Sequence, residues 1–526
     1  MPSNNSGFMF AERRSSLLFA GGCVLVTAGV ILHLPMYWMA RNMGFVLAGM
    51  PMSPEMYVGM VLIVLGVAAA AYGLLPRSNL VYGSEDVKFA PPEDAPLTAA
   101  HWLLMAALAI GLVIDIMKPA TLGFVTPGMQ AEYHVSKAIV ARFPLSALTG
   151  LTLGSFFWGW LADRYGRRAA ILLSAVIFDA TSICGAMPSI DWNIFMCFMM
   201  GLGAGGMLPV AYALLAENMP TKHRGWCLVL IGGIGAVGGY LVTAGLSAVL
   251  QPTYGWRVMW FLNMPTGLML IVLGPLLPES ARFLMSMGRT AEAQAVLARF
   301  GAVRVATGAQ QEPKPAHTLL PPVDHDYIAP TIALTLAALA WGFVNFGLLL
   351  WLPSTLVAEG QSVGLASTII ARSTLLAAPL VVLCIFLYGW WSTKWSLVSA
   401  ITVITAGLVV MVLREEGVQL VQNPLIPITL LIIGSSGIIA ILLPYTAENY
   451  PIRIRGRAIG WIAGCTKGGG LIAQGAASLA LVPAIGNVAL IIAVPAMLAL
   501  VLVGRFGRET RMRDLRELEG AALQKT

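Results

Sequence analysis

The chain of 526 residues is strongly apolar: 58% of its residues are hydrophobic, 11% are charged, and the mean hydropathy is +0.79. Because an ordinary soluble domain is about 25% charged, these values exclude a water-soluble enzyme, a disordered chain and a fibrous protein. The net charge of +7 fits an unequal distribution of loop charge better than nucleic-acid binding, so no nucleic-acid partner is expected.

Fourteen apolar segments have about the length of a membrane-spanning helix and are predicted to cross a lipid bilayer. The predicted fold class is therefore an all-α membrane protein. Two extra helices lie in an N-terminal extension (1–98), six form a first bundle (99–277), and six form a second bundle (329–504). A central loop (278–328) separates the bundles, and a charged tail (505–526) follows them. The predicted spans are 16–37, 55–75, 101–121, 138–160, 169–187, 192–216, 226–250, 257–277, 330–354, 364–389, 396–413, 424–446, 458–482 and 484–504.

Basic residues are distributed unequally between the two sides of these spans. With the N-terminus in the cytoplasm, 24 of the 32 Lys and Arg residues fall in cytoplasmic segments, six on the outer side and two inside spans. An excess of basic residues marks cytoplasmic loops. We therefore expect a multi-pass protein of the cell (plasma or inner) membrane with both termini in the cytoplasm.

An internal repeat relates the two bundles. Glu217 and Glu448, 231 positions apart, each open the pattern Glu-Asn-x-Pro followed by Arg-Gly, and Arg142 and Arg372 correspond at an offset of 230. Two related halves around a central cavity are a common plan of secondary transporters. The alternative is a repeat that only builds a scaffold, but scaffolds rarely keep charges inside the membrane.

A loop between two predicted spans reads Gly-Trp-Leu-Ala-Asp-Arg-Tyr-Gly-Arg-Arg over residues 159–168. Its glycines permit a tight turn and its charges can bridge helix ends, which predicts a conformational latch; simple positive-inside anchoring is the alternative. Membrane-edge pairs extend this prediction, since partial desolvation strengthens a charge pair. The predicted latch comprises Gly159, Asp163, Arg164, Gly166, Arg167 and Arg168, with the pairs Glu217–Arg224, Glu279–Arg282 and Glu448–Arg455.

This loop strongly resembles the signature loop of the major facilitator superfamily, and the resemblance covers residues 101–520. Residues 201–209 look like the fourth core helix of the sugar-porter and metabolite:proton symporter branches, and 278–284 are similar to the motif after their sixth core helix. The resemblance implies a major facilitator fold and alternating access. It also implies Glu and Arg networks on the cytoplasmic side that lock the outward-open state.

Departures from the family pattern refine this expectation. The second copy of the loop, residues 389–396, has Thr393 where Asp163 repeats, which predicts a latch confined to the first half. Cys197 stands where the family often has an arginine associated with proton coupling. Ala236 replaces the proline of the family's antiporter motif, which weakens an antiporter interpretation.

Four charged residues are predicted to remain inside the bilayer, away from its boundaries. Asp115 and Lys118 share a helix face; aromatic-acid:proton symporters resemble this chain at Asp115 but carry a second acid at the position of Lys118. Lys467 lies about nine residues into its span, roughly 13 Å deep, beside a small-residue face of Gly460, Gly464 and Gly468. Asp179 is the fourth and a candidate proton carrier.

Each intramembrane charge has a functional and a structural interpretation. A buried cation is costly, so Lys118 and Lys467 predict an anion site. The alternatives are a permanent Asp115–Lys118 pair, a Lys467 that pairs with Asp179 or a backbone carbonyl, and an Asp179 that only supports packing.

Three further polar residues are candidates for substrate contact. Asn345 lies among aromatic residues and could line a substrate site or a lipid-facing surface. Arg142 and Arg372 are expected near the outer boundary, where they could recruit anions or merely anchor the helices.

We therefore predict a secondary active transporter of a small organic solute, in particular an organic anion taken up with protons. An exporter of an organic acid or drug-like compound and a membrane sensor or scaffold are the alternatives. No enzyme motif, metal spacing or cofactor motif is present in the sequence. The phosphate-binding pattern GxxxxGK[ST] of ATP-driven proteins is absent as well, so the proton gradient is the expected energy source. A monomer is expected, with the lipid bilayer around it. Three roles stay open for the two N-terminal helices: contact with a partner, shielding of the bundle, or docking on its lipid-facing side.

Overall fold

The computed structural model describes residues 13–75, 96–301, 327–450 and 452–511, and within these residues the secondary structure is helical. Thirteen described helices are long and apolar enough to cross a membrane. α20 (Ile452–Ser478) is a further helix of 27 residues with lower hydrophobicity. Its early arginines and Lys467 explain that difference. The predicted all-α membrane fold is thereby confirmed, and these thirteen helices together with α20 are compatible with the predicted fourteen spans.

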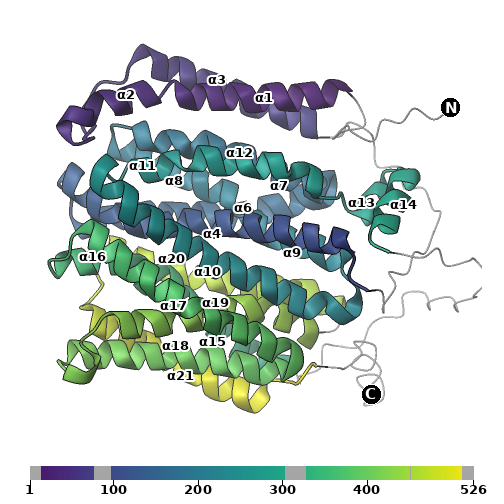
Figure 1. The fold of residues 1–526 in the computed structure, drawn as a ribbon. Coiled ribbons are helices and arrows are strands. Elements are labelled where there is room, and N and C mark those ends of the chain that lie inside the picture. The colour runs from purple at the N-terminus through teal and green to yellow at the C-terminus, as the bar shows by residue number, and fades with distance from the viewer. Residues whose placement is uncertain (1–12, 76–95, 302–326, 451, 512–526) are drawn as a thin grey trace, which may run out of the picture.

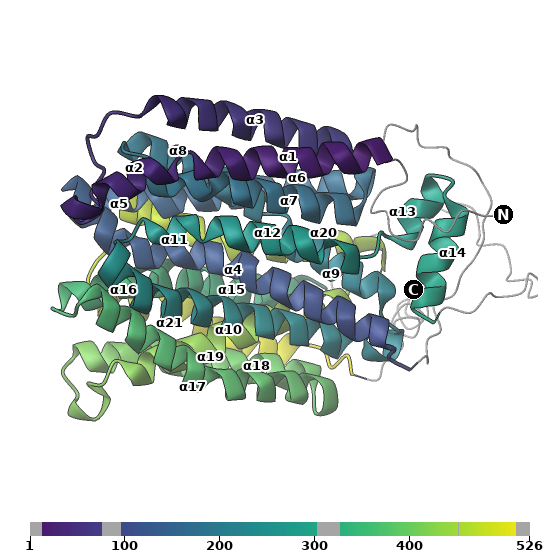
Figure 2. The same ribbon diagram turned by 45° about the horizontal axis from the view of Figure 1, so that its top comes forward.

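The N-terminal extension forms a helical hairpin on one side of the molecule (Figures 1 and 2). α1 and α3 pack closely because small residues meet: a Cβ on Gly22 would lie 2.5 Å from the backbone nitrogen of Ala70. This is the way small residues let membrane helices approach. The hairpin consists of α1 (Arg13–Ile31), α2 (Leu34–Met39), the 3-10 turn η1 (Ala40–Met43) and α3 (Pro54–Leu74).

The first bundle shows the same use of glycine. A Cβ on Gly150, Gly154 or Gly201 would collide with the backbone of the facing helix, so α6 and α8 touch without intervening side chains. The helices of this bundle are α4 (Ala99–Tyr133), α5 (Lys137–Val140), α6 (Arg142–Tyr165), α7 (Arg167–Ala180), η2 (Thr181–Ala186), α8 (Ile190–Ala204), α9 (Met207–Asn218), α10 (Thr221–Tyr254), α11 (Val258–Phe261) and α12 (Asn263–Leu273).

The second bundle follows a short helical pair, α13 (Ala281–Ser286) and α14 (Thr290–Arg299). This pair lies at one end of the molecule (right in Figure 1), which we call the loop end; the opposite end is the far end. The helices of this bundle are α15 (Ile328–Phe343), a π-helical turn η5 (Val344–Leu348), α16 (Leu349–Ala358), α17 (Val363–Trp390), α18 (Thr393–Glu415), α19 (Leu425–Asn449), α20 and α21 (Ile485–Phe506).

One sequence-based packing expectation is wrong. A Cβ on Gly460 or Gly464 would meet open space, whereas a Cβ on Gly469 would lie 2.5 Å from the carbonyl oxygen of Leu339. The glycines that pack α20 against α15 are therefore one step around the helix from the predicted face. A regular four-residue spacing marks a face but does not tell which neighbour covers it.

Candidate functional site

A cavity of about 100 Å³ lies between the two bundles. Among the described residues that line it, Asp115 from α4 and Lys467 from α20 are the charged ones. Lys467 Nζ donates a hydrogen bond to Ser155 Oγ of α6, so this side chain bridges the bundles. Asp115 Oδ1 accepts no hydrogen bond from a described residue. The cavity therefore holds one cation and one carboxyl group that has capacity for a further partner.

One wall of the cavity contains two aromatic rings and the side-chain amide of Asn345. Trp341 and Phe346 line it, and their rings meet edge to face with centroids 5.4 Å apart. Asn345 sits in the π-helical turn, a feature often found at functional sites. Its Oδ1 accepts hydrogen bonds from Tyr240 (3.2 Å) and Ser435 (3.3 Å). Asn345 thus faces the cavity rather than lipid, held by residues from both bundles.

Lys118 is buried behind the cavity and is absent from its described lining. Its Nζ donates to Asn263 Oδ1 at 3.1 Å and lies 4.1 Å from the ring centroid of Phe178. Asp115 lies within electrostatic range of Lys118, but the described residues form no Asp115–Lys118 ion pair. The expectation of a permanent pair between these two side chains is therefore wrong, because Asn263 holds the ammonium.

Asp179 lies outside the cavity lining as well. Its Oδ2 accepts a hydrogen bond of 2.8 Å from Thr27 of the N-terminal hairpin. The suggested pairing of Asp179 with Lys467 is therefore wrong. A contact between the extra helices and an intramembrane carboxyl group had no signal in the sequence, since Thr27 and Asp179 are 152 positions apart.

At the loop end, the signature loop forms a polar network. Arg167 contacts Glu217 at 2.5 Å and Asp163 at 3.5 Å. Glu279 Oε1 accepts hydrogen bonds from the backbone N–H groups of Arg167 (2.7 Å) and Arg168 (3.3 Å), and so caps the start of α7. Burial raises the pKa of the Glu279 carboxyl, and the hydrogen bonds from Ser280, Arg168 and Arg167 oppose that effect.

The loop geometry explains one of its two predicted glycines. Gly166 has φ +104, a left-handed conformation that favours glycine, and a Cβ there would collide with the carboxyl group of Glu279. Gly159 has open space around its Cβ position, so it serves no close helix approach. Arg164 is exposed, with its guanidinium 5.7 Å from the ring centroid of Tyr165.

One of the three predicted Glu–Arg pairs is wrong. Glu217 is bound by Arg167 and not by Arg224, whose Nη2 donates to the carbonyl oxygen of Met219 at 3.4 Å. The side chains of Arg282 and Arg455 lie outside the described residues.

The second half carries a network of its own, which overturns the expectation of a latch confined to the first half. Glu509 accepts hydrogen bonds from the Thr393 N–H (3.0 Å) and hydroxyl (2.7 Å) and from Ser392, so it caps α18 as Glu279 caps α7. Burial would raise the pKa of Glu509, but these hydrogen bonds outweigh it and lower the pKa to about 2. Glu448 accepts from Tyr388 (2.8 Å) and Thr510 (2.6 Å).

The two arginines expected at the outer boundary are exposed, whereas a third arginine, which was not predicted as a site residue, is buried. Arg142 and Arg372 are exposed and do not line the cavity. Arg257, by contrast, is buried at the far end and forms an ion pair of 2.7 Å with Glu132. The signal available in the sequence was an acid and a base that end and begin spans on the same side.

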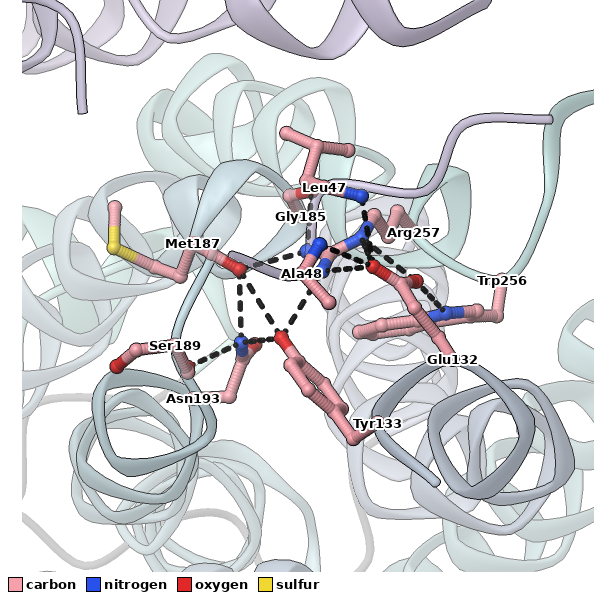
Figure 3. Close-up of polar contacts among 10 residues, drawn as sticks. All are labelled: Leu47, Ala48, Glu132, Tyr133, Gly185, Met187, Ser189, Asn193, Trp256 and Arg257. Carbon is pink, nitrogen blue, oxygen red and sulfur yellow. Dashed lines mark hydrogen bonds and ion pairs between the residues drawn. The ribbon is translucent and has the colours of Figure 1, made fainter. Parts of the chain in front are cut away.

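Figure 3 shows how this pair is satisfied. Glu132 also accepts hydrogen bonds from Trp256 Nε1 (2.7 Å) and from the backbone N–H groups of Leu47 (2.8 Å) and Ala48 (2.9 Å). Arg257 donates further bonds, including one of 2.8 Å to the carbonyl oxygen of Met187. The hairpin loop is therefore a full member of this buried network.

Comparison with known proteins agrees with this geometry. Residues 118–317 match the family model described as sugar (and other) transporter. The niacin transporter NiaP of Acinetobacter baylyi is 25% identical over 72% of this chain and 87% of its own length. The gallate transporter of Pseudomonas putida is 26% identical over 72% and 85%. A partially occluded, inward-open structure of the xylose transporter XylE from E. coli superimposes with a TM-score of 0.63 at 18% identity, covering 79% of this chain and 100% of that one.

Two six-helix bundles around a shared cavity are the fold of the xylose transporter, and the family model and relatives that match this multi-pass chain are transporters, not enzymes. The chain thus resembles secondary transporters of the major facilitator superfamily in sequence and shares their fold, with two additional N-terminal helices.

Proposed function

We propose that the chain carries a small aromatic carboxylate across the membrane by alternating access, together with protons. The observation that carries this proposal is the central cavity, in which the ammonium group of Lys467 faces Asp115 beside the rings of Trp341 and Phe346. An ammonium group binds a carboxylate, and aromatic walls bind a flat ring. The relatives named for niacin and gallate both handle a carboxylate on an aromatic ring.

The charges of the cavity give a reason for proton coupling. In a site of low dielectric, an extra anion is costly unless a proton or cation accompanies it. When a carboxylate binds Lys467, Asp115 loses its nearest favourable charge in the cavity and takes up a proton more readily. Substrate and proton would then enter together, as they do in the xylose relative described as a proton symporter. Asp179, next to Lys118, is a second candidate proton carrier.

The outer parts of the site would serve gating. The loop-end network around Arg167, Glu217 and Glu279 would hold one conformation and release in the other. Arg142 and Arg372 would attract the anion at the far end, where exposed arginines can collect it. We further propose that the loop end and both termini lie in the cytoplasm, and that the protein works as a monomer in the cell membrane.

Transport in proteoliposomes tests the proposal. The wild-type protein is expected to accumulate labelled nicotinate or gallate when the outside is more acidic than the inside. Lys467→Gln is expected to lower the uptake rate by about tenfold to a hundredfold, since a hydrogen bond to a charged group contributes about 1.5–3 kcal/mol. Lys137→Gln is the matched control, because Lys137 is exposed on α5.

Two outcomes would contradict the proposal. Equal uptake by wild type and Lys467→Gln would exclude Lys467 as the carboxylate partner. Accumulation only under the reversed pH gradient would indicate an exporter.

A further inference from the structure

The N-terminal hairpin touches the core at an ionisable residue. Thr27 Oγ1 lies 2.8 Å from Asp179 Oδ2 and 2.9 Å from the carbonyl oxygen of Cys23 in its own helix. A threonine hydroxyl has one proton but can also accept hydrogen bonds. It can therefore donate to only one of these two oxygens at full strength at any moment.

This arrangement suits both protonation states of Asp179. When Asp179 is ionised, the Thr27 hydroxyl donates to the carboxylate. When Asp179 carries a proton, it can donate to Thr27 Oγ1, and the hydroxyl then turns to the carbonyl oxygen of Cys23. A rotation about one bond thus keeps the buried polar groups paired in either state, which avoids the penalty of an unmade hydrogen bond.

Further contacts hold the hairpin against the first bundle. Tyr37 donates to the carbonyl oxygen of Tyr254 at 2.7 Å, and Leu47 and Ala48 donate to buried Glu132. These contacts lie between the hairpin and the first bundle at the far end, whereas Thr27 lies within α1. α1 and α3 both pack against α7.

The other groups around Asp179 are few. Among the described residues, those that act electrostatically on it are Lys118 from α4 and the thiol of Cys23 from α1. α12 presents Gly267, at which a Cβ would lie 2.9 Å from the Asp179 nitrogen. α3, α6, α8 and α9 direct no charged side chain at Asp179 within the described part of the chain. Its Oδ1 accepts no hydrogen bond from a described residue.

We propose that the N-terminal hairpin is a working part of the proton-coupling machinery, in which Thr27 is the positioning residue that lets Asp179 gain and lose a proton behind the substrate cavity. This inference rests on the proposed proton-coupled transport and assigns a role to the two helices that lie outside the two bundles. Asp179 communicates with the cavity through Lys118, which lies within electrostatic range of both Asp179 and Asp115.

The pH profile of transport in the full-length protein tests this inference. Thr27→Val removes the hydroxyl at nearly constant volume, so the ionised form of Asp179 loses its donor. The limb of the pH profile that reports protonation of Asp179 is expected to move toward higher pH by about one unit. The reason is that a carboxylate that loses a hydrogen-bond donor binds its proton more tightly. Thr27→Ser keeps the hydroxyl and is expected to keep the wild-type profile.

A double-mutant comparison shows whether the effect passes through Asp179. In an Asp179→Asn background, Thr27→Val is expected to cause no further shift. A structural defect alone would lower the amount of folded protein or the maximal rate without moving the profile, and thermal unfolding of each variant in detergent measures that separately.

Each outcome has one meaning. If wild type transports no aromatic carboxylate in a pH-dependent manner, the proposed function fails. If wild type does so but Thr27→Val and Thr27→Ser have the same profile, the role of Thr27 is excluded. If Thr27→Val shifts the profile equally with and without Asp179, the hydroxyl acts through another group and the inference is overturned.

Discussion

Among single residues, Lys118 and Lys467 are two lysines whose ammonium groups have different surroundings. Lys467 borders the cavity and reaches across it to Ser155. Lys118 is fully buried and is held by one amide oxygen and one aromatic ring. A buried ammonium with few partners is costly, so its surroundings matter more than its distance from substrate.

Asn263 is therefore expected to be important for stability. Asn263→Leu removes the 3.1 Å hydrogen bond from Lys118 and should lower the free energy of unfolding by about 1.5–3 kcal/mol. Adding Lys118→Met should recover much of this loss, since replacing both partners by apolar groups can be nearly neutral. Thermal unfolding in detergent measures both effects. Equal melting temperatures for wild type and Asn263→Leu would show that Asn263 does not stabilise the ammonium.

On the scale of helices and loops, the buried Glu132–Arg257 pair joins parts that are far apart in the sequence. α4 supplies Glu132, the turn before α11 supplies Arg257, and the loop after η1 supplies two backbone donors (Figure 3). The side chains of Arg257 and Glu132 are 0% and 4% exposed. Removing one partner of such a pair leaves an uncompensated buried charge.

Glu132→Gln is accordingly expected to destabilise the protein by about 3–5 kcal/mol. The matched control is Glu359→Gln, which breaks the partly exposed Arg414–Glu359 pair of 2.7 Å and should change stability by about 1 kcal/mol or less. The melting temperature and the yield of monodisperse protein check both. A loss no larger for Glu132→Gln than for Glu359→Gln would mean that the network is not needed for stability.

For the whole molecule, transport requires the two bundles to move relative to each other. Contacts between them at the far end include a hydrogen bond of 2.8 Å between Ser247 of α10 and Ser367 of α17. Both side chains are buried. Such contacts must break whenever the far end opens.

A cross-link at this position should stop the cycle. The double variant Ser247→Cys/Ser367→Cys is expected to form a disulfide under mild oxidation, since the two oxygens are 2.8 Å apart and a disulfide needs Cβ atoms about 3.5–4.5 Å apart. Substrate flux should fall to background and return after reduction. Because the native chain has six cysteines, each single variant serves as a control. Undiminished flux in the cross-linked protein would show that the far end does not open there.

Much of the helical architecture was predictable because it depends on where apolar residues cluster along the chain. The length of the apolar runs predicts the spans, and the repeat predicts two bundles. The depth of Lys467 along its helix likewise agrees with its place beside the cavity. The second-half network was missed because Ser392 and Thr393 bear no charge, although they bind Glu509 well.

The sequence by itself predicted which segments form long apolar helices, that the basic residues concentrate in the loops of one side, and which four charged residues lie within those helices. Only the tertiary structure decided their partners: Asn263 for Lys118, Thr27 for Asp179 and Ser155 for Lys467. The physical reason is that helical periodicity specifies the face of a helix on which a side chain lies. The neighbour that covers this face comes from a segment 145, 152 or 312 positions away, chosen by packing of the whole bundle.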